Sequence, residues 1–416
     1  MGKRTYRTVD FNRFDWTKAQ ALERLIVGVD VAKHDFVAAL ETPEGCRLGV
    51  VKWRHPRDTR GLLEVLDERL AGVRLEVVME SSGTYGDALR WQLFRRGVAV
   101  YRVSAKHVHD AAEVFDGVAS LHDGKSAALI AELHRQGRSR RREMESEQRR
   151  RGKALLRRVE LAQERYQRAF NRLEARLSRH WPELGEVARL DGTAVQRLLA
   201  ACGSPDAVAA SGEQAVEELR RWSRWRLSRE RCEAVVASAV ETLGMPCCAH
   251  ERADLQGLAA ELLEASQARR EGERAVDREV DEDPVLTRWS EVVGRTTAVV
   301  LRCALGVPKG YASARAYLKA AGLNLKERSS GKHQGRLRLT KRGPGVARQY
   351  LYFAVLRWLQ RDAWASAWYE AKIARDGGLK GKAITALMRK LLRALWACAR
   401  SGEAFDTGRL FAPGRA

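Results

Sequence analysis

The chain has 416 residues, enough for two or three domains with substantial cores. Lys and Arg number 75 against 53 Asp and Glu, and this net charge of +22 is spread along the chain, which indicates an acidic polymer as partner, nucleic acid first. No apolar run reaches the ~20 residues of a membrane span, no signal peptide is recognisable, and the seven cysteines lack paired metal spacing. We expect a cytoplasmic protein with reduced thiols and no contact with a membrane.

Residues 24–137 alternate between strand and helix patterns. Strands are predicted at Leu25–Val29, Phe36–Glu41, Arg47–Trp53, Leu75–Met79 and Val98–Val103. Helices are predicted at Thr59–Leu70 and Thr84–Arg96, with two more on either side of Asp116-Gly117. Three consecutive strands followed by alternating helices and strands are typical of the RNase H fold, whose sheet is mixed.

Three acidic residues stand at the ends or starts of these elements. Asp30 ends the apolar run that begins at Leu25, Glu80 ends the run that begins at Val77, and Asp123 opens a helical stretch. A carboxylate at the end of a buried strand is held rigidly at a sheet edge that a ligand can approach. Converging acids there would hold a hard cation such as Mg2+ and orient phosphate oxygens for attack.

The middle region, 138–284, is rich in Arg and Glu and contains a partial heptad-like seam. The pattern in 138–179 predicts a long helix or an antiparallel coiled coil. Its Arg runs form either a solvated face or a track for a phosphate backbone. Residues 220–226, Arg-Arg-Trp-Ser-Arg-Trp-Arg, fit either a stacking platform for unpaired bases or ordinary helix packing.

The third region, 285–405, is helical and contains a basic loop. A glycine turn at Gly294 opens a helix whose backbone N–H groups suit a phosphate. The loop from residue 329 to 345 can approach a phosphodiester closely, and it carries a candidate nucleophile, Ser329 or Ser330. A helix is predicted at Val346–Trp358.

These pieces together resemble the DEDD insertion-sequence transposases, the bridge-RNA-guided recombinases that include the Piv/MooV-type DNA invertases. The matching stretches are 27–33, 80–85, 116–131, 321–323, 329–331 and 340–343, and their order and spacing carry the resemblance. It implies an α/β plus all-α chain: an N-terminal extension (1–23), an RNase H/RuvC-like DEDD domain (24–137), a coiled-coil and helical middle (138–284), a helical C-terminal transposase domain with the serine loop (285–405), and a tail (406–416).

The resemblance also implies the chemistry. Asp30, Glu80 and Asp123 become ligands of Mg2+, and a serine that forms a transient covalent link to DNA corresponds best to Ser330, with Ser329 as the alternative. The residues expected to contact nucleic acid are Lys33, Tyr85, Lys125, Lys332, Arg336, Lys341 and Arg342. The implied partners are donor and target double-stranded DNA, a structured guide RNA and further copies of the chain in a dimer or tetramer, in the bacterial cytoplasm at the nucleoid.

One position departs from the family pattern. The family has a fourth acid three residues after the third, and this chain has Ser126 there. A hydroxyl can ligate Mg2+ without contributing charge, so a second metal would be held more weakly. Three interpretations follow: a working recombinase with Ser126 as a ligand, a relative that binds nucleic acid without cutting it, or a metal-dependent structure-specific nuclease that uses water.

Overall fold

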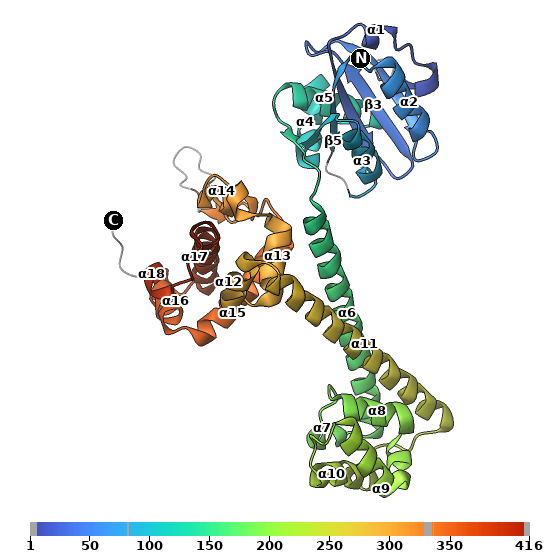
Figure 1. Ribbon diagram of the computed structural model, residues 1–416, viewed down its shortest axis with the longest axis vertical. Coiled ribbons are helices and arrows are strands. Elements are labelled where there is room, and N and C mark those ends of the chain that lie inside the picture. Colours follow the sequence, from blue (N-terminus) through green and yellow to red (C-terminus); the bar gives the residue numbers. More distant parts are fainter. Residues whose placement is uncertain (1–5, 81–82, 328–334, 336, 412–416) are drawn as a thin grey trace. The chain divides into compact units, whose positions relative to one another are not determined.

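The computed structural model describes residues 6–80, 83–327, 335 and 337–411. The chain divides into two compact units, Met1–Glu145 and Ser146–Ala416. The first unit is built on a β-sheet and the second is almost entirely helical (Figure 1). Among the described residues, no helix is both long enough and apolar enough to cross a membrane.

The sheet of the first unit has seven strands in the order β1-β4-β3-β2-β5-β6-β7. Strands β2, β3 and β4 form an antiparallel meander, β5 and β6 continue it in parallel with β2, and β7 is antiparallel to β6. The strands are β1 (Thr8–Asp10), β2 (Arg24–Val31), β3 (Asp35–Glu41), β4 (Arg47–Arg54), β5 (Arg74–Glu80), β6 (Ala99–Val103) and β7 (Arg140–Arg141). The five strands predicted from the sequence are confirmed, and so is the mixed sheet.

Helices cover both faces of this sheet. Helices α2 (Thr59–Arg69) and α3 (Asp87–Arg95) pack on one face, and α4 (Ala105–Asp116) and α5 (Asp123–Arg135) pack on the other. Side chains alternate along β2, so Val27 and Val29 face α2 and α3, whereas Ile26 belongs to the α4 and α5 side. Asp30 follows the same alternation and lies on the side of α5.

Gly28 allows α5 to lie directly against the sheet. A Cβ atom on Gly28 would be 2.6 Å from the backbone nitrogen of Ala131 and still closer to the carbonyl oxygen of Ala127. Both neighbours are backbone atoms of α5, which cannot rotate away as a side chain could. The absence of a side chain at this position therefore sets the distance between the helix and β2.

The segment expected to be an extension instead belongs to the first unit. Residues 8–10 form β1, which pairs in parallel with β4, and Phe11, Trp16 and Ala19 are buried in the core. The short helices η1 (Phe11–Arg13) and α1 (Thr17–Gln20) lie in this stretch. The segment lacks a continuous apolar run, so the signal from its few anchoring aromatic residues is weak in the sequence.

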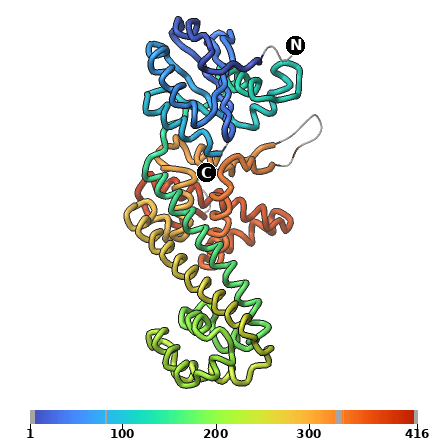
Figure 2. Tube along the Cα trace, turned by 90° about the vertical axis from the view of Figure 1, so that its right-hand side faces the viewer, coloured from blue at the N-terminus to red at the C-terminus, as the bar shows by residue number. Residues whose placement is uncertain are grey.

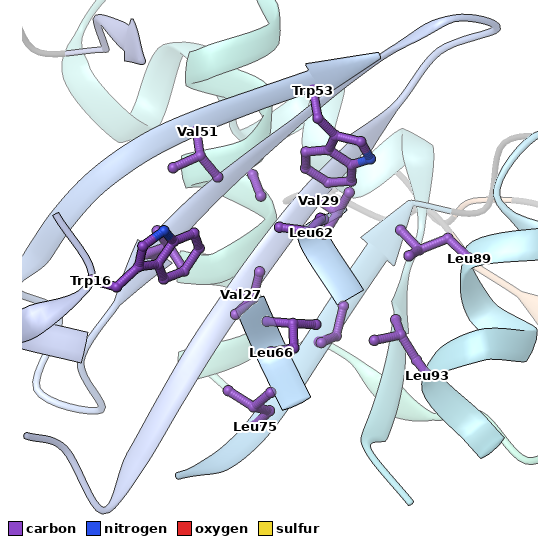
Figure 3. Close-up of a pocket in the computed structure, with 13 residues that line it drawn as sticks. Trp16, Val27, Val29, Val51, Trp53, Leu62, Leu66, Leu75, Leu89 and Leu93 are labelled. Atoms are coloured by element: carbon purple, nitrogen blue, oxygen red, sulfur yellow. The ribbon is translucent and has the colours of Figure 1, made fainter. Parts of the chain in front are cut away.

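The core between the sheet and the α2–α3 layer contains a small space of about 30 Å³ (Figure 3). Its lining is apolar throughout and includes Trp16, Val27, Trp53 and Leu62. A space of this size holds at most about one water molecule, and it offers no polar partner for one. It is a packing gap and not a substrate site.

Two long helices, α6 (Glu147–His180) and α11 (Ala249–Asp281), lie side by side in the second unit (Figures 1 and 2). Ion pairs link the two helices, and the residue numbers of the partners in α11 fall as those in α6 rise, so the helices are antiparallel. These pairs are Arg151–Glu279, Arg158–Glu271, Arg172–Glu261, Arg176–Asp254 and Arg179–Glu251. Some of the Arg residues that the sequence left between solvent and phosphate therefore face carboxylates of the partner helix.

The long helix begins later than the sequence pattern predicted. The prediction was a helical start at residue 138, whereas α6 starts at Glu147 with Ser146 as its N-cap. Residues 140–141 form the edge strand β7 instead. The many Arg residues in this stretch suit a solvated helix and an exposed edge strand equally well, so composition alone did not separate the two.

Two apolar clusters fill the rest of the second unit. One lies among α6, α8, α9, α10 and α11, and the other among α11 to α17. The remaining elements are α7 (Leu184–Val187), α8 (Thr193–Cys202), α9 (Pro205–Trp222), α10 (Arg229–Val240), α12 (Pro284–Val293), α13 (Arg295–Leu305), η2 (Pro308–Gly310), α14 (Ala314–Ala320), β8 (Leu325–Lys326), β9 (Arg338–Leu339), α15 (Gly345–Arg361), α16 (Ala363–Arg375), α17 (Lys380–Ser401) and α18 (Thr407–Phe411). Residues 407–411, expected as tail, form α18, and Phe411 packs against the second cluster.

Candidate active site

Asp30 and Glu80 lie at the carboxyl ends of the adjacent strands β2 and β5. Val29 pairs with Met79 in the parallel register, so Asp30 and Glu80 occupy the next position on adjacent strands. Asp123 is the first residue of α5, the helix that packs on the same face of the sheet. β2, β5 and α5 thus bring the three acids predicted as a site to the same end of the sheet.

The charges of Asp123 and Glu80 shift the pKa of Asp30. Burial and the negative charges of Asp123 and Glu80 raise the pKa of Asp30 from 3.8 to about 6. Burial also raises the pKa of Glu80. A partly buried carboxylate that feels the negative charge of two others is the electrostatic environment that a bound metal ion would relieve.

Ser126 lies one helical turn from Asp123 and donates a hydrogen bond to the Asp30 carboxylate. That bond favours the ionised form of Asp30 and partly offsets the repulsion from its acidic neighbours. Ser126 was predicted as a metal ligand. In the structure its hydroxyl is already directed at one of the predicted ligands, so it acts on the carboxylate set through Asp30.

The donor set suits Mg2+, a hard cation that takes carboxylate oxygens. Asp30, Glu80 and Asp123 would hold it. Within the part of the chain that the structure describes, however, no three His, Cys, Asp or Glu side chains lie close enough together to hold a metal ion. Binding would therefore draw the three carboxylates closer than they are here.

Lys125 does not occupy the exposed position that its predicted role in nucleic-acid binding requires. Its side chain is 1% exposed, and its Nζ donates to Asp116 Oδ1 at 2.7 Å and to the carbonyl oxygen of Val118 at 2.5 Å. Tyr6 donates to the other carboxylate oxygen of Asp116 at 3.0 Å. Lys125 thus ties the turn before α5 to the first turn of that helix, and so supports the position of Asp123.

The other two predicted nucleic-acid contacts of this unit, Lys33 and Tyr85, have exposed side chains. They lie in the loops that follow β2 and β5 respectively. Sequence reasoning missed Arg90 in α3, which is buried, pairs with Asp87 and approaches Gly86 in the loop after Glu80. Its spacing of three residues from Asp87 was the available signal.

The serine loop has a well-defined base in the second unit. Strands β8 and β9 pair in an antiparallel hairpin, and below them Thr340 donates its backbone N–H to the carbonyl oxygen of Asn324 at 2.9 Å. Gly322 and Gly343 bring two chain segments into backbone contact, because a Cβ on Gly343 would lie 2.8 Å from the nitrogen of Gly322. Arg348 donates to the carbonyl oxygens of Ala321 and Gly343, both at 3.0 Å.

The predicted nucleophiles themselves, Ser329 and Ser330, lie outside the described residues, and so do Lys332 and Arg336. Lys341 and Arg342 are exposed beside the base of the loop. Lys341 has a left-handed backbone, with φ of 53°, and its N–H donates to the carbonyl oxygen of Gly322 at 3.0 Å. The hairpin thus fixes the two ends of the segment that carries the serines.

Two protein-family models match the chain. A family model of DEDD transposases of the IS110 type, described as Transposase, matches residues 27–182, and a second, Transposase IS116/IS110/IS902 family, matches residues 290–370. No curated protein sequence matches the chain. The two matches define the chain as a transposase, an enzyme that acts on DNA. It belongs to the IS110 family of insertion-sequence transposases.

Proposed function

We propose that this transposase cuts and rejoins DNA with Mg2+ held by Asp30, Glu80 and Asp123 and with a serine nucleophile, Ser330 or Ser329. The observation that carries the proposal is the position of Asp30 and Glu80 at one end of the sheet, where the negative charges of Glu80 and of Asp123 act on Asp30. Mg2+ bound there would polarise a phosphodiester and offset the charge that develops on its oxygens.

The residues of the chain then have separate tasks. The three carboxylates orient the scissile phosphate, and Ser126 keeps Asp30 ionised through its hydrogen bond. The serine oxygen forms a bond to phosphorus while the P–O bond to the leaving strand breaks, and the leaving oxygen takes up the serine proton. The resulting ester conserves the phosphodiester energy, so the reverse step rejoins a strand without a high-energy cofactor.

Further parts of the proposal concern architecture and partners. The strand order of the first unit supports an RNase H/RuvC-like domain, and the antiparallel pair of α6 and α11 supports a coiled-coil middle region between it and the C-terminal transposase domain. The net charge of +22 supports binding to double-stranded DNA and to a structured guide RNA. By family resemblance, we also propose a dimer or tetramer as the active form.

The test is a covalent adduct. The purified chain is mixed with RNA transcribed from the DNA that flanks its gene, as the source of the proposed guide, and with a matching DNA. It should form a Mg2+-dependent protein–DNA adduct that Ser330→Ala or Ser329→Ala abolishes. Asp30→Asn should abolish the same adduct. Cutting that survives both serine substitutions would instead identify a metal-dependent nuclease that uses water. No adduct and no recombinant product from the intact chain would overturn the recombinase proposal.

A binding protein that has lost cleavage is the second candidate, and the position of Ser126 favours it. The expected fourth acid is replaced by a hydroxyl that is already bonded to Asp30. This candidate predicts tight, salt-sensitive binding of nucleic acid without chemistry. Ser126→Asp would then restore cutting if the fourth charge were the only missing element.

A further inference from the structure

The turn after α9 exposes an aromatic ring within an Arg-rich stretch of the middle region. Residues 220–231 contain six Arg and one Glu. The two tryptophans of this stretch have different environments: Trp222 packs against the apolar cluster of α6 and α8–α11, whereas Trp225 is 62% exposed. The two readings of this motif, packing and stacking platform, therefore each describe one of its tryptophans.

The backbone of the turn that carries Trp225 is strained. Arg224 and Trp225 both have left-handed conformations, with φ of 54° and 62°. Glycine usually occupies such positions after a helix, because side chains there cost about 1–2 kcal/mol per residue. The turn is held by hydrogen bonds from the backbone N–H of Trp225 to the carbonyl oxygen of Arg220 at 2.8 Å and from that of Arg224 to Arg221 at 3.0 Å. Strain that is retained at an exposed large side chain indicates a function for that side chain.

The surroundings of the ring suit a nucleic-acid strand. The guanidinium of Arg220 lies over the Trp225 ring, 4.6 Å from its centroid, while most of the Trp225 surface remains exposed. Arg221, Arg224 and Arg226 are exposed, and none has an ion-pair partner among the described residues. Arg229, by contrast, is fully engaged by Glu213, Glu217 and Glu233. Positive charge is therefore left uncompensated around the ring and neutralised one turn further along.

We infer that Trp225 is a stacking platform for an unpaired nucleobase, with Arg221, Arg224 and Arg226 contacting the phosphates on either side of that base. An aromatic face accepts any base, and uncompensated Arg side chains follow the backbone of a flexible strand. A base paired within a duplex cannot reach the ring, because both of its faces are covered by its neighbours in the stack. The surface therefore fits a single-stranded segment of RNA or DNA and discriminates against duplex.

This surface deepens the proposed nucleic-acid binding, and its test does not depend on catalysis. The full chain is titrated in EDTA with labelled oligonucleotides of equal length, oligo(U) RNA, oligo(dT) and a blunt DNA duplex, and binding is followed by fluorescence anisotropy. Trp225→Ala should weaken binding to the unpaired strands roughly 5- to 100-fold and leave duplex binding unchanged. Trp225→Phe should retain most of the affinity, because an aromatic face remains. A larger loss on oligo(U) than on oligo(dT) would assign the surface to RNA, and equal losses to unpaired strands of either sugar.

Trp364→Ala provides the matched control, because Trp364 in α16 is 61% exposed and lies outside this turn. Its affinity for the unpaired strands should equal that of the unmodified chain. The inference is overturned if Trp225→Ala binds unpaired strands normally, if it loses duplex binding to the same extent, or if Trp364→Ala or Trp225→Phe loses as much. Failure here would leave the adduct test of the active site untouched, and the reverse also holds.

Discussion

The sheet of the first unit holds partly or fully buried acids at both of its ends, and their pKa values are shifted in opposite directions. Glu76, on β5, accepts hydrogen bonds from Arg24 at 2.6 Å and from His134 Nε2 at 3.0 Å, with Arg74 at 3.4 Å. Burial alone would raise the pKa of Glu76, but the bonds from His134 and Arg24 outweigh it and hold the pKa below its ordinary value. Asp30, at the other end, is surrounded by further acids, and its pKa is raised.

This contrast distinguishes a structural carboxylate from the one that we propose as a metal ligand. Glu76 has compensating positive charges built into the fold. Asp30 has two acidic neighbours, and only hydrogen bonds from the Val31 backbone and from Ser126 favour its ionised form among the main influences on it. A carboxylate whose charge is not balanced in this way is a candidate for a functional site.

The largest expected effect is the loss of chemistry on Asp30→Asn. The substitution removes a ligand from the proposed metal site, so adduct formation should fall at least ~1,000-fold. The metal-free protein should be as stable as the unmodified chain or more so, because the substitution also removes repulsion from Glu80 and Asp123. Adduct assays and thermal unfolding in EDTA measure the two effects. A large loss of stability would show that Asp30 is structural like Glu76.

Glu76→Gln should produce the opposite pattern. It leaves the buried His134 and the Arg24 guanidinium without their anionic partner, so we expect a loss of about 1–3 kcal/mol in the free energy of unfolding. Urea unfolding followed by circular dichroism measures it. If stability were unchanged, the Glu76 network would contribute nothing and the comparison between the two ends would fail.

The pH dependence should also reveal Asp30. Its folded pKa of about 6 lies above its ordinary 3.8, so the folded metal-free protein holds a proton between these values that the unfolded chain has released. The stability from this proton is fully present below about pH 4 and is lost as the pH rises through 6. Mg2+ should therefore raise the melting temperature more at pH 8 than at pH 5. Asp30→Asn should remove this difference, and an equal Mg2+ effect at both pH values would contradict the assignment.

The smallest effect is expected from Arg24→Gln. Arg24 is 42% exposed, so water screens its ion pair with Glu76, and such pairs contribute about 0–1 kcal/mol. His134 and Arg74 remain to compensate Glu76. Comparing the unfolding free energies of Arg24→Gln and Glu76→Gln shows how much of the network lies in the buried acid itself. A loss from Arg24→Gln as large as that from Glu76→Gln would place the stabilisation in the surface pair.

The order of strands and the three acids could be predicted because each leaves a local trace, an apolar run that ends on a carboxylate. The role of Lys125 could not, because its partner Asp116 ends the preceding helix α4 and only the folded chain shows that this lysine is buried. Likewise, the residues of β1 are anchored by contacts with β4 that no local pattern encodes. The sequence does not distinguish Trp222 from Trp225. The left-handed turn between α9 and α10 leaves Trp225 exposed, whereas Trp222 packs against the core.

Gly28 has a consequence for how far the proposed active site can vary. Because α5 rests on the bare backbone at Gly28, a side chain there would push α5 away from β2, and Asp123 and Ser126, which both act on Asp30, belong to that helix. We expect Gly28→Ala to move α5 away from β2 and so to separate Asp123 from Asp30, although the substitution changes neither residue. The distances between Asp30 and the residues of α5 thus depend on Gly28, a residue that has no side chain.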